Sequence, residues 1–197
     1  MASLDGSAPP RQLSSLYSVR ALFGNREDVF FAGGETKDSL FLYHVSANGN
    51  GLTRVVPNQV LFSYDVSPNG KWVAAWEGTA VVIYSADGRS RRLMCGNCAT
   101  AGEENRGVTP PLVKWSRDGK YLYFHTTESR ATYVVPLRLG QMLPMIPDAG
   151  FKSIVDAATS LGGKPISEPR AFAGPDPSMY AFPRGATHRN IYRIHVP

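Results

Sequence analysis

The chain has 197 residues, of which 43% are hydrophobic and 11% aromatic, a composition that supports one globular domain or one compact repeat array with a buried core. The formal net charge of +5 is mild, and the one dense basic cluster, residues 89–92, falls where an outer strand is expected, so nucleic-acid binding is not expected. No apolar run reaches the roughly 18 residues of a membrane helix, and residues 1–6 lack the basic and apolar regions of a secretory signal, so we expect no membrane insertion by this chain.

The first predicted element is a short outer strand at residues 4–13. It begins with an Asp-Gly turn and continues as a short polar stretch, and the same order recurs at residues 47–55 and 86–93. No other strand precedes it. We therefore expect this strand to join a sheet built from a later part of the chain.

Three units of strands follow, at residues 14–58, 59–110 and 111–164. In two of them a glycine turn, Ser67-Pro68-Asn69-Gly70 or Ser116-Arg117-Asp118-Gly119, leads into an alternating strand, which is the signature of a β-hairpin. The outer strand of the third unit is uncertain because residues 141–147 are rich in proline. The predicted strands are 16–23, 29–32, 39–45 and 52–56, then 60–66, 71–77, 80–85 and 89–94, then 112–116, 120–126 and 131–137.

A fourth unit, residues 165–197, supplies predicted strands at 166–173, 178–182 and 190–196 and lacks an outer strand. Residues 4–13 would complete it and close a ring of four units. The alternative is a fragment of a larger ring, in which case two copies could pair as a homodimer. Two insertions, 95–111 and 144–164, lie outside the regular pattern, and the second contains the one plausible helix, at 151–158.

The blocks at residues 67–74 and 115–124 resemble the repeats of TolB-like β-propellers, which are relatives of WD-repeat propellers without the WD dipeptide. The ending, at 180–182 and 189–194, resembles the last blade of propellers attached to bacterial, acidobacterial-type serine/threonine protein kinases. The resemblance implies an all-β propeller of about four four-stranded antiparallel blades. None of the kinase signatures occurs in this sequence, so if the parent protein is a kinase, the resemblance implies that this chain is its sensing or docking half.

Cys95 and Cys98 form the most conspicuous motif. A local disulfide and a pair of free thiols both fit this spacing, whereas redox catalysis and a zinc site are less favoured. Zinc needs about four ligands, and the chain has no further cysteine. A disulfide would close only a small loop and would weakly suggest an oxidising compartment.

Catalytic chemistry has little support in the sequence. A propeller lyase or hydrolase would gather histidines and carboxylates around a central funnel, and the candidates are His125, His188, Glu103 and Glu104. Such residues more often solvate loops, and no nucleophile motif accompanies them. We therefore predict no catalytic residue, no metal and no cofactor.

The remaining conspicuous residues receive structural interpretations. Trp72, Trp76 and Trp115 are predicted to pack between sheets, and the aspartates at positions 65, 118 and 176 to support turns. The overall prediction is a non-catalytic binding, scaffolding or sensory module of a larger bacterial protein, extracytoplasmic if that parent is membrane-anchored, whose partner is a protein, peptide or glycan. The alternatives are the lyase or hydrolase and an accessory propeller of a peptidase.

Overall fold

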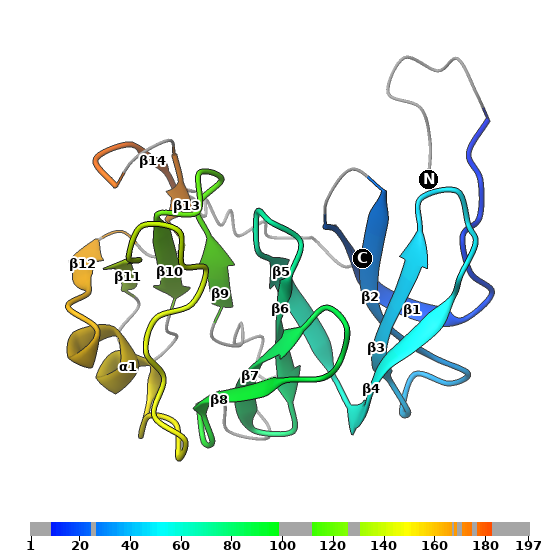
Figure 1. The fold of residues 1–197 in the computed structure, drawn as a ribbon, viewed down its shortest axis with the longest axis horizontal. Coiled ribbons are helices and arrows are strands. Elements are labelled where there is room, and N and C mark those ends of the chain that lie inside the picture. Colours follow the sequence, from blue (N-terminus) through cyan, green and yellow to red (C-terminus); the bar gives the residue numbers. More distant parts are fainter. Residues whose placement is uncertain are drawn as a thin grey trace, which may run out of the picture.

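Three four-stranded antiparallel sheets follow one another along the chain and stand side by side (Figure 1). The computed structural model describes residues 9–24, 27–98, 112–125, 131–166, 168, 171–174 and 177–182. In each sheet the strands are hydrogen-bonded in the order in which they occur in the sequence. The first sheet contains β1 (Tyr17–Phe23), β2 (Asp28–Gly34), β3 (Phe41–Ser46) and β4 (Thr53–Gln59). The second sheet contains β5 (Phe62–Val66), β6 (Trp72–Glu77), β7 (Ala80–Ser85) and β8 (Arg91–Cys95). The third sheet contains β9 (Leu112–Trp115), β10 (Tyr121–His125), β11 (Thr132–Pro136) and β12 (Lys164–Ile166).

The predicted glycine turns form because local side chains satisfy the backbone. In the turn between β5 and β6, the Gly70 N–H donates to the Ser67 carbonyl, and Gly70 has the positive φ of 70° that this turn requires. The Ser67 hydroxyl donates to Asn69 Oδ1 at 2.8 Å and accepts the Trp72 N–H at 2.9 Å. The turn after Ser116 repeats these bonds. Both hairpins are therefore specified locally.

Apolar side chains fill the spaces between neighbouring sheets. Between the first two sheets lie Phe30, Leu42, Val73 and Tyr84 with their neighbours. Between the second and third sheets lie Trp76 and Trp115, as predicted, together with Ile154, Ala157 and Ala158 of helix α1 (Ile154–Ser160). The sheets thus share continuous cores and pack face to face.

The first strands of the three sheets lie next to one another, because β5 contacts both β1 and β9. This is the arrangement of successive blades around a propeller axis. The predicted all-β fold of four-stranded antiparallel blades is therefore confirmed for the described part of the chain.

The outer strand of the third sheet lies where the sequence predicted the beginning of the fourth unit. β12 pairs with β11, so that Ile166 lies opposite Thr132. Residues 141–147 form no strand, since Pro144 and Pro147 have no N–H to donate to a ladder. Beyond β12, β13 (Phe172–Ala173) and β14 (Tyr180–Ala181) form a two-stranded sheet, and the predicted strand 190–196 lies outside the described residues.

The predicted N-terminal strand is not formed in the part of residues 4–13 that the structure describes. Residues 4–8 lie outside the described residues, and residues 9–13 have no strand conformation. Pro9 and Pro10 cannot donate backbone hydrogen bonds. Instead, Leu13 packs against the first sheet, and the Arg11 guanidinium donates to the Ala47 carbonyl.

Helix α1 begins three residues later than predicted, at Ile154. Ser153 caps it, since its hydroxyl accepts the Asp156 N–H at 3.0 Å, and Asp156 in turn accepts the Lys152 N–H. In the parts of the chain that the structure describes, no helix has the length and apolarity to span a membrane.

Candidate functional site

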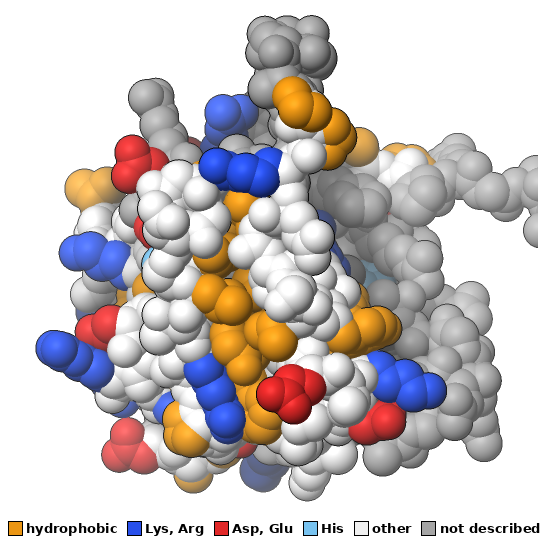
Figure 2. All heavy atoms as spheres, turned by 90° about the vertical axis from the view of Figure 1, so that its right-hand side faces the viewer, with side chains coloured by type: hydrophobic (Ala, Val, Ile, Leu, Met, Phe, Trp, Pro, Cys, Tyr) orange, Lys and Arg blue, Asp and Glu red, His pale blue; other side chains and the backbone are white. Residues whose placement is uncertain are grey.

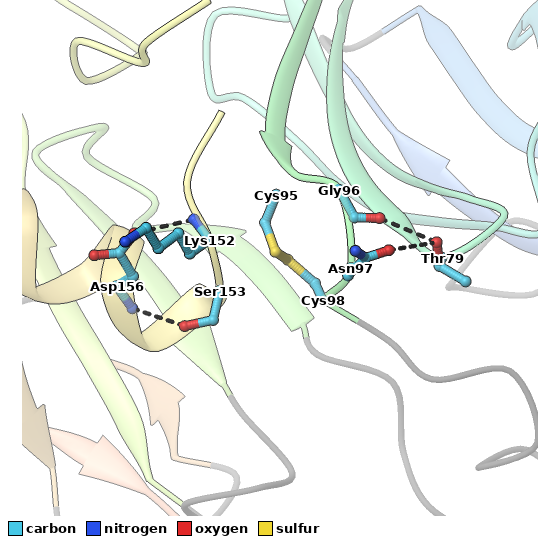
Figure 3. The surroundings of a disulfide bond; sticks show 8 residues. All are labelled: Thr79, Cys95, Gly96, Asn97, Cys98, Lys152, Ser153 and Asp156. Atoms are coloured by element: carbon cyan, nitrogen blue, oxygen red, sulfur yellow. Dashed lines mark hydrogen bonds between the residues drawn. A yellow bond between two sulfur atoms is a disulfide. The ribbon is translucent and has the colours of Figure 1, made fainter. Parts of the chain in front are cut away.

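Cys95 and Cys98 are joined in a disulfide at the end of β8 (Figure 3). Cys95 is fully buried, and the Cys98 N–H donates to the Thr79 carbonyl at 3.1 Å. The Thr79 hydroxyl donates to the Gly96 carbonyl at 3.0 Å, so the small loop is tied back to the sheet. Of the alternatives predicted for these two cysteines, the structure therefore contains the local disulfide.

Of the four predicted funnel residues, only His125 lies in the described part of the chain, so the funnel stays a prediction. His125 is buried in β10, and its Nδ1 lies 3.3 Å from the Thr132 hydroxyl oxygen, which also accepts the Ala171 N–H. His188, Glu103 and Glu104 lie outside the described residues. No group of three His, Cys, Asp or Glu residues that could hold a metal occurs among the residues described.

A cavity of about 530 Å³ lies where the inner strands of the second and third sheets reach their turns. We call it the inner-strand pocket. Such a volume is typical of ligand sites. Its lining combines charged and aromatic side chains, chiefly those of Asp65, Lys114, Trp115, Arg117 and Tyr123.

Asp65 was predicted to support a turn, but it lies within strand β5 and joins two sheets. Its carboxylate accepts the N–H of Trp115, the last residue of β9, at 2.8 Å. Burial raises the pKa of the Asp65 carboxyl, and the backbone N–H groups of Trp115 and Val66 partly oppose this effect, with Lys114 and Arg20 adding to the opposition. The prediction failed because the partner lies 50 residues away.

Lys114 occupies the equivalent position of β9, and burial lowers the pKa of its ammonium. The positive charge of Arg20 lowers it further, whereas Asp65 acts in the opposite direction. Arg20 lies at a bulge in β1 with a φ of 49°, and its carbonyl accepts the Ser63 hydroxyl at 3.0 Å. Charged residues from three successive inner strands therefore influence one another, and two of them, Asp65 and Lys114, line this pocket.

The sequence contains a pattern that indicates this polar site, although the site was not predicted from it. Asp65 and Lys114 stand at the same position in their strands, two residues before the serine of each glycine turn. A charged residue within a short, otherwise buried inner strand is costly unless it is paired or functional. Two such residues at matching positions indicate a shared polar site.

No protein-family model matches the sequence, and no curated protein matches it. Solved structures that are similar to part of this chain include the following three. A chain from a nidogen/laminin complex is 13% identical with a TM-score of 0.48, and the match covers 69% of this chain and 50% of that one. TolB from Acinetobacter baumannii is 13% identical with a TM-score of 0.44, covering 67% and 34%. A protein of unknown function from Bacteroides thetaiotaomicron is 12% identical with a TM-score of 0.42, covering 68% and 34%.

The matched region spans half or less of each of these chains. Similarity at this level carries no argument about ligand or partner, so the blade arrangement is assigned from the sheets themselves. The resemblance to kinase-attached propellers stays a prediction.

Proposed function

We propose that the chain is a non-catalytic binding module and that its inner-strand pocket holds an acidic segment of a partner protein. The observation that carries this proposal is the cationic excess at the pocket. Lys114 and Arg117 belong to its lining, in which Asp65 is the one carboxylate among the described residues, and the positive charge of Arg20 acts on Lys114. A ligand carboxylate would relieve the mutual repulsion of Arg20 and Lys114.

The pocket is also held rigidly, which favours binding because little order is lost when a ligand arrives. The Asp65 carboxylate fixes the backbone of β9 against β5, and the Trp115 indole donates to the Met142 carbonyl at 2.7 Å. Ser63 fixes the bulge at Arg20. Blades that hold loops and charged groups in fixed positions suit a display or docking role.

The test is fluorescence polarisation with a labelled hexapeptide of alternating glutamate and serine, compared with its glutamine counterpart. We expect binding of the glutamate peptide, weakened by salt, and a loss of roughly tenfold in Lys114→Gln, the effect of one charge-assisted hydrogen bond. Arg117→Gln, at an exposed position, should also weaken binding without a threat to the fold.

The matched control is Lys120→Gln. Lys120 lies in the same sheet's hairpin and is paired with Asp118 at 3.3 Å, away from the pocket lining. Equal binding of the two peptides, or equal losses in the variants of Lys114, Arg117 and Lys120, would refute the proposal. Binding of oligogalacturonate in place of the peptide would reassign the pocket to acidic glycans and overturn the choice of a protein partner.

A further inference from the structure

A second cavity, of about 730 Å³, lies between the segment 138–147 and helix α1. We call it the insertion pocket, since most of its wall belongs to the stretch after β11 that departs from the blade pattern. It shares no lining residue with the inner-strand pocket. A smaller hollow of about 270 Å³ adjoins it, lined by Trp72 and Arg92 of the second sheet, and both hollows include Leu143, Pro144 and Met145.

We propose that these two hollows form one groove that binds an extended, apolar and acidic segment of a partner protein across the ridge 143–145. The first observation is exposure. Leu139 is 97% exposed and Met145 is 76% exposed, the highest values for large hydrophobic side chains in the described part of the chain. Exposed apolar side chains beside a concave apolar wall mark interaction sites. A methionine at the ridge suits varied apolar contacts because its side chain is flexible and polarisable.

The second observation concerns the chemistry of the walls. Pro136, Pro144 and Pro147 contribute apolar rings and no N–H donors. The remaining apolar surface comes mainly from Leu143, Phe151 and Leu161. These walls therefore favour apolar side chains of a ligand.

The third observation is charge. Each hollow has one arginine in its lining, Arg138 in the larger and Arg92 in the smaller, and these are the only ionisable groups among the lining residues described. No ion pair involves either arginine within the described residues. Carboxylates on both sides of an apolar anchor would match these two positions.

The ridge is anchored to the rest of the protein, so the groove exists before any ligand binds. The Trp115 indole donates to the Met142 carbonyl, and the Phe151 N–H donates to the Met94 carbonyl at 2.8 Å. Leu143 and Ile146 pack on the core between the second and third sheets. Met145 remains exposed, whereas Leu143 and Ile146 are held by this packing.

The probe is a labelled peptide in which aspartate alternates with leucine and phenylalanine, measured by fluorescence polarisation with the full chain. We expect Met145→Asp to weaken binding at least tenfold, because it places a carboxylate on the ridge between the two hollows. Arg138→Gln and Arg92→Gln should each weaken binding and lower its salt dependence. Both arginines and Met145 are exposed, so these variants leave the core intact.

Met179→Asp is the matched control, since Met179 is 55% exposed and lies outside both hollows. Lys114→Gln should leave binding of this peptide unchanged, because Lys114 lines only the inner-strand pocket. This variant therefore distinguishes a failure of the groove proposal from a failure of the inner-strand-pocket proposal. Unaltered binding in Met145→Asp, or equal losses in Met145→Asp and Met179→Asp, would overturn the proposal. Binding of dodecanoate without the peptide, lost in Met145→Asp, would also overturn it and assign the groove to fatty acids.

Discussion

Glu77 shows how one residue connects strands of two sheets. Its carboxylate accepts hydrogen bonds from Asn58 in the first sheet at 3.0 Å and from Arg91 in its own sheet at 3.0 and 3.1 Å, and it also accepts the Tyr84 hydroxyl. Burial of the carboxyl raises its pKa, but the hydrogen bonds from Arg91, Tyr84 and Asn58 together outweigh burial and hold the pKa below the ordinary 4.5. The ionised form of Glu77 therefore stabilises the fold.

We expect Glu77→Gln to lower the free energy of unfolding at pH 7 by about 1–2 kcal/mol, because the charged acceptor is lost. A pKa that is lower in the folded chain means that the contribution is complete above about 4.5 and is lost as the pH falls through the folded value. Urea unfolding at decreasing pH should therefore show the wild type and the variant converging. A gap that stays constant with pH would contradict this, and Glu35→Gln at an exposed position is the control.

For single residues, the sequence predicts hydrogen bonds within a turn well and hydrogen bonds to residues far away in the sequence poorly. Asp118 supports its turn as predicted, since it accepts the Ser116 hydroxyl at 2.7 Å and the Lys120 N–H at 3.1 Å. Asp65 has the same side chain but lies two residues before its turn, within β5, and it bonds to Trp115 in the next sheet. The difference depends on which strand becomes a neighbour, and that is decided by packing between blades.

Among the elements, the glycine turns are the most predictable because all their bonds join residues close in sequence. The serines at positions 67, 85 and 116 each donate to an Asn or Asp side chain two residues on and accept a backbone N–H five residues on. Strand β12 was missed because its partner is β11, reached only after the segment 138–147 and helix α1. Its three residues have no alternating pattern that would mark them as a strand.

Ser116→Ala should lower the free energy of unfolding by about 1–3 kcal/mol, since it removes the buried Ser116 hydroxyl that accepts the Tyr121 N–H. Ser85→Ala is the matched comparison, because Ser85 makes equivalent bonds but is half-buried, and water can replace its hydroxyl. We therefore expect a smaller loss in Ser85→Ala, measured by urea unfolding. Equal losses of unfolding free energy at the two positions would show that burial of the serine does not determine how much the turn stabilises the fold.

At the scale of the whole molecule, the outward faces of the first and third sheets are covered differently. Tyr180 of β14 and Ala171 pack on Tyr123 and Val134 of the third sheet. On the first sheet, an apolar stripe crosses the face seen in Figure 2. In this sheet the buried cluster of Val29, Phe31 and Val45 is packed by Leu13, Leu16 and Tyr43, with the rings of Phe31 and Tyr43 stacked 5.8 Å apart. Sequence alternation predicts an apolar face but cannot say which segment covers it.

Replacing both Leu13 and Leu16 with serine should uncover that face and make the chain self-associate. The exposed Phe31 and Val29 would offer an apolar patch, and such a patch on a sheet is an association hazard. Light scattering should show a mass that rises with protein concentration, whereas Leu139→Ser, at a position already 97% exposed, should not differ from wild type. Urea unfolding should confirm that the double variant is folded. If it is folded and keeps the wild-type mass, these two leucines are not what covers the apolar face of the first sheet.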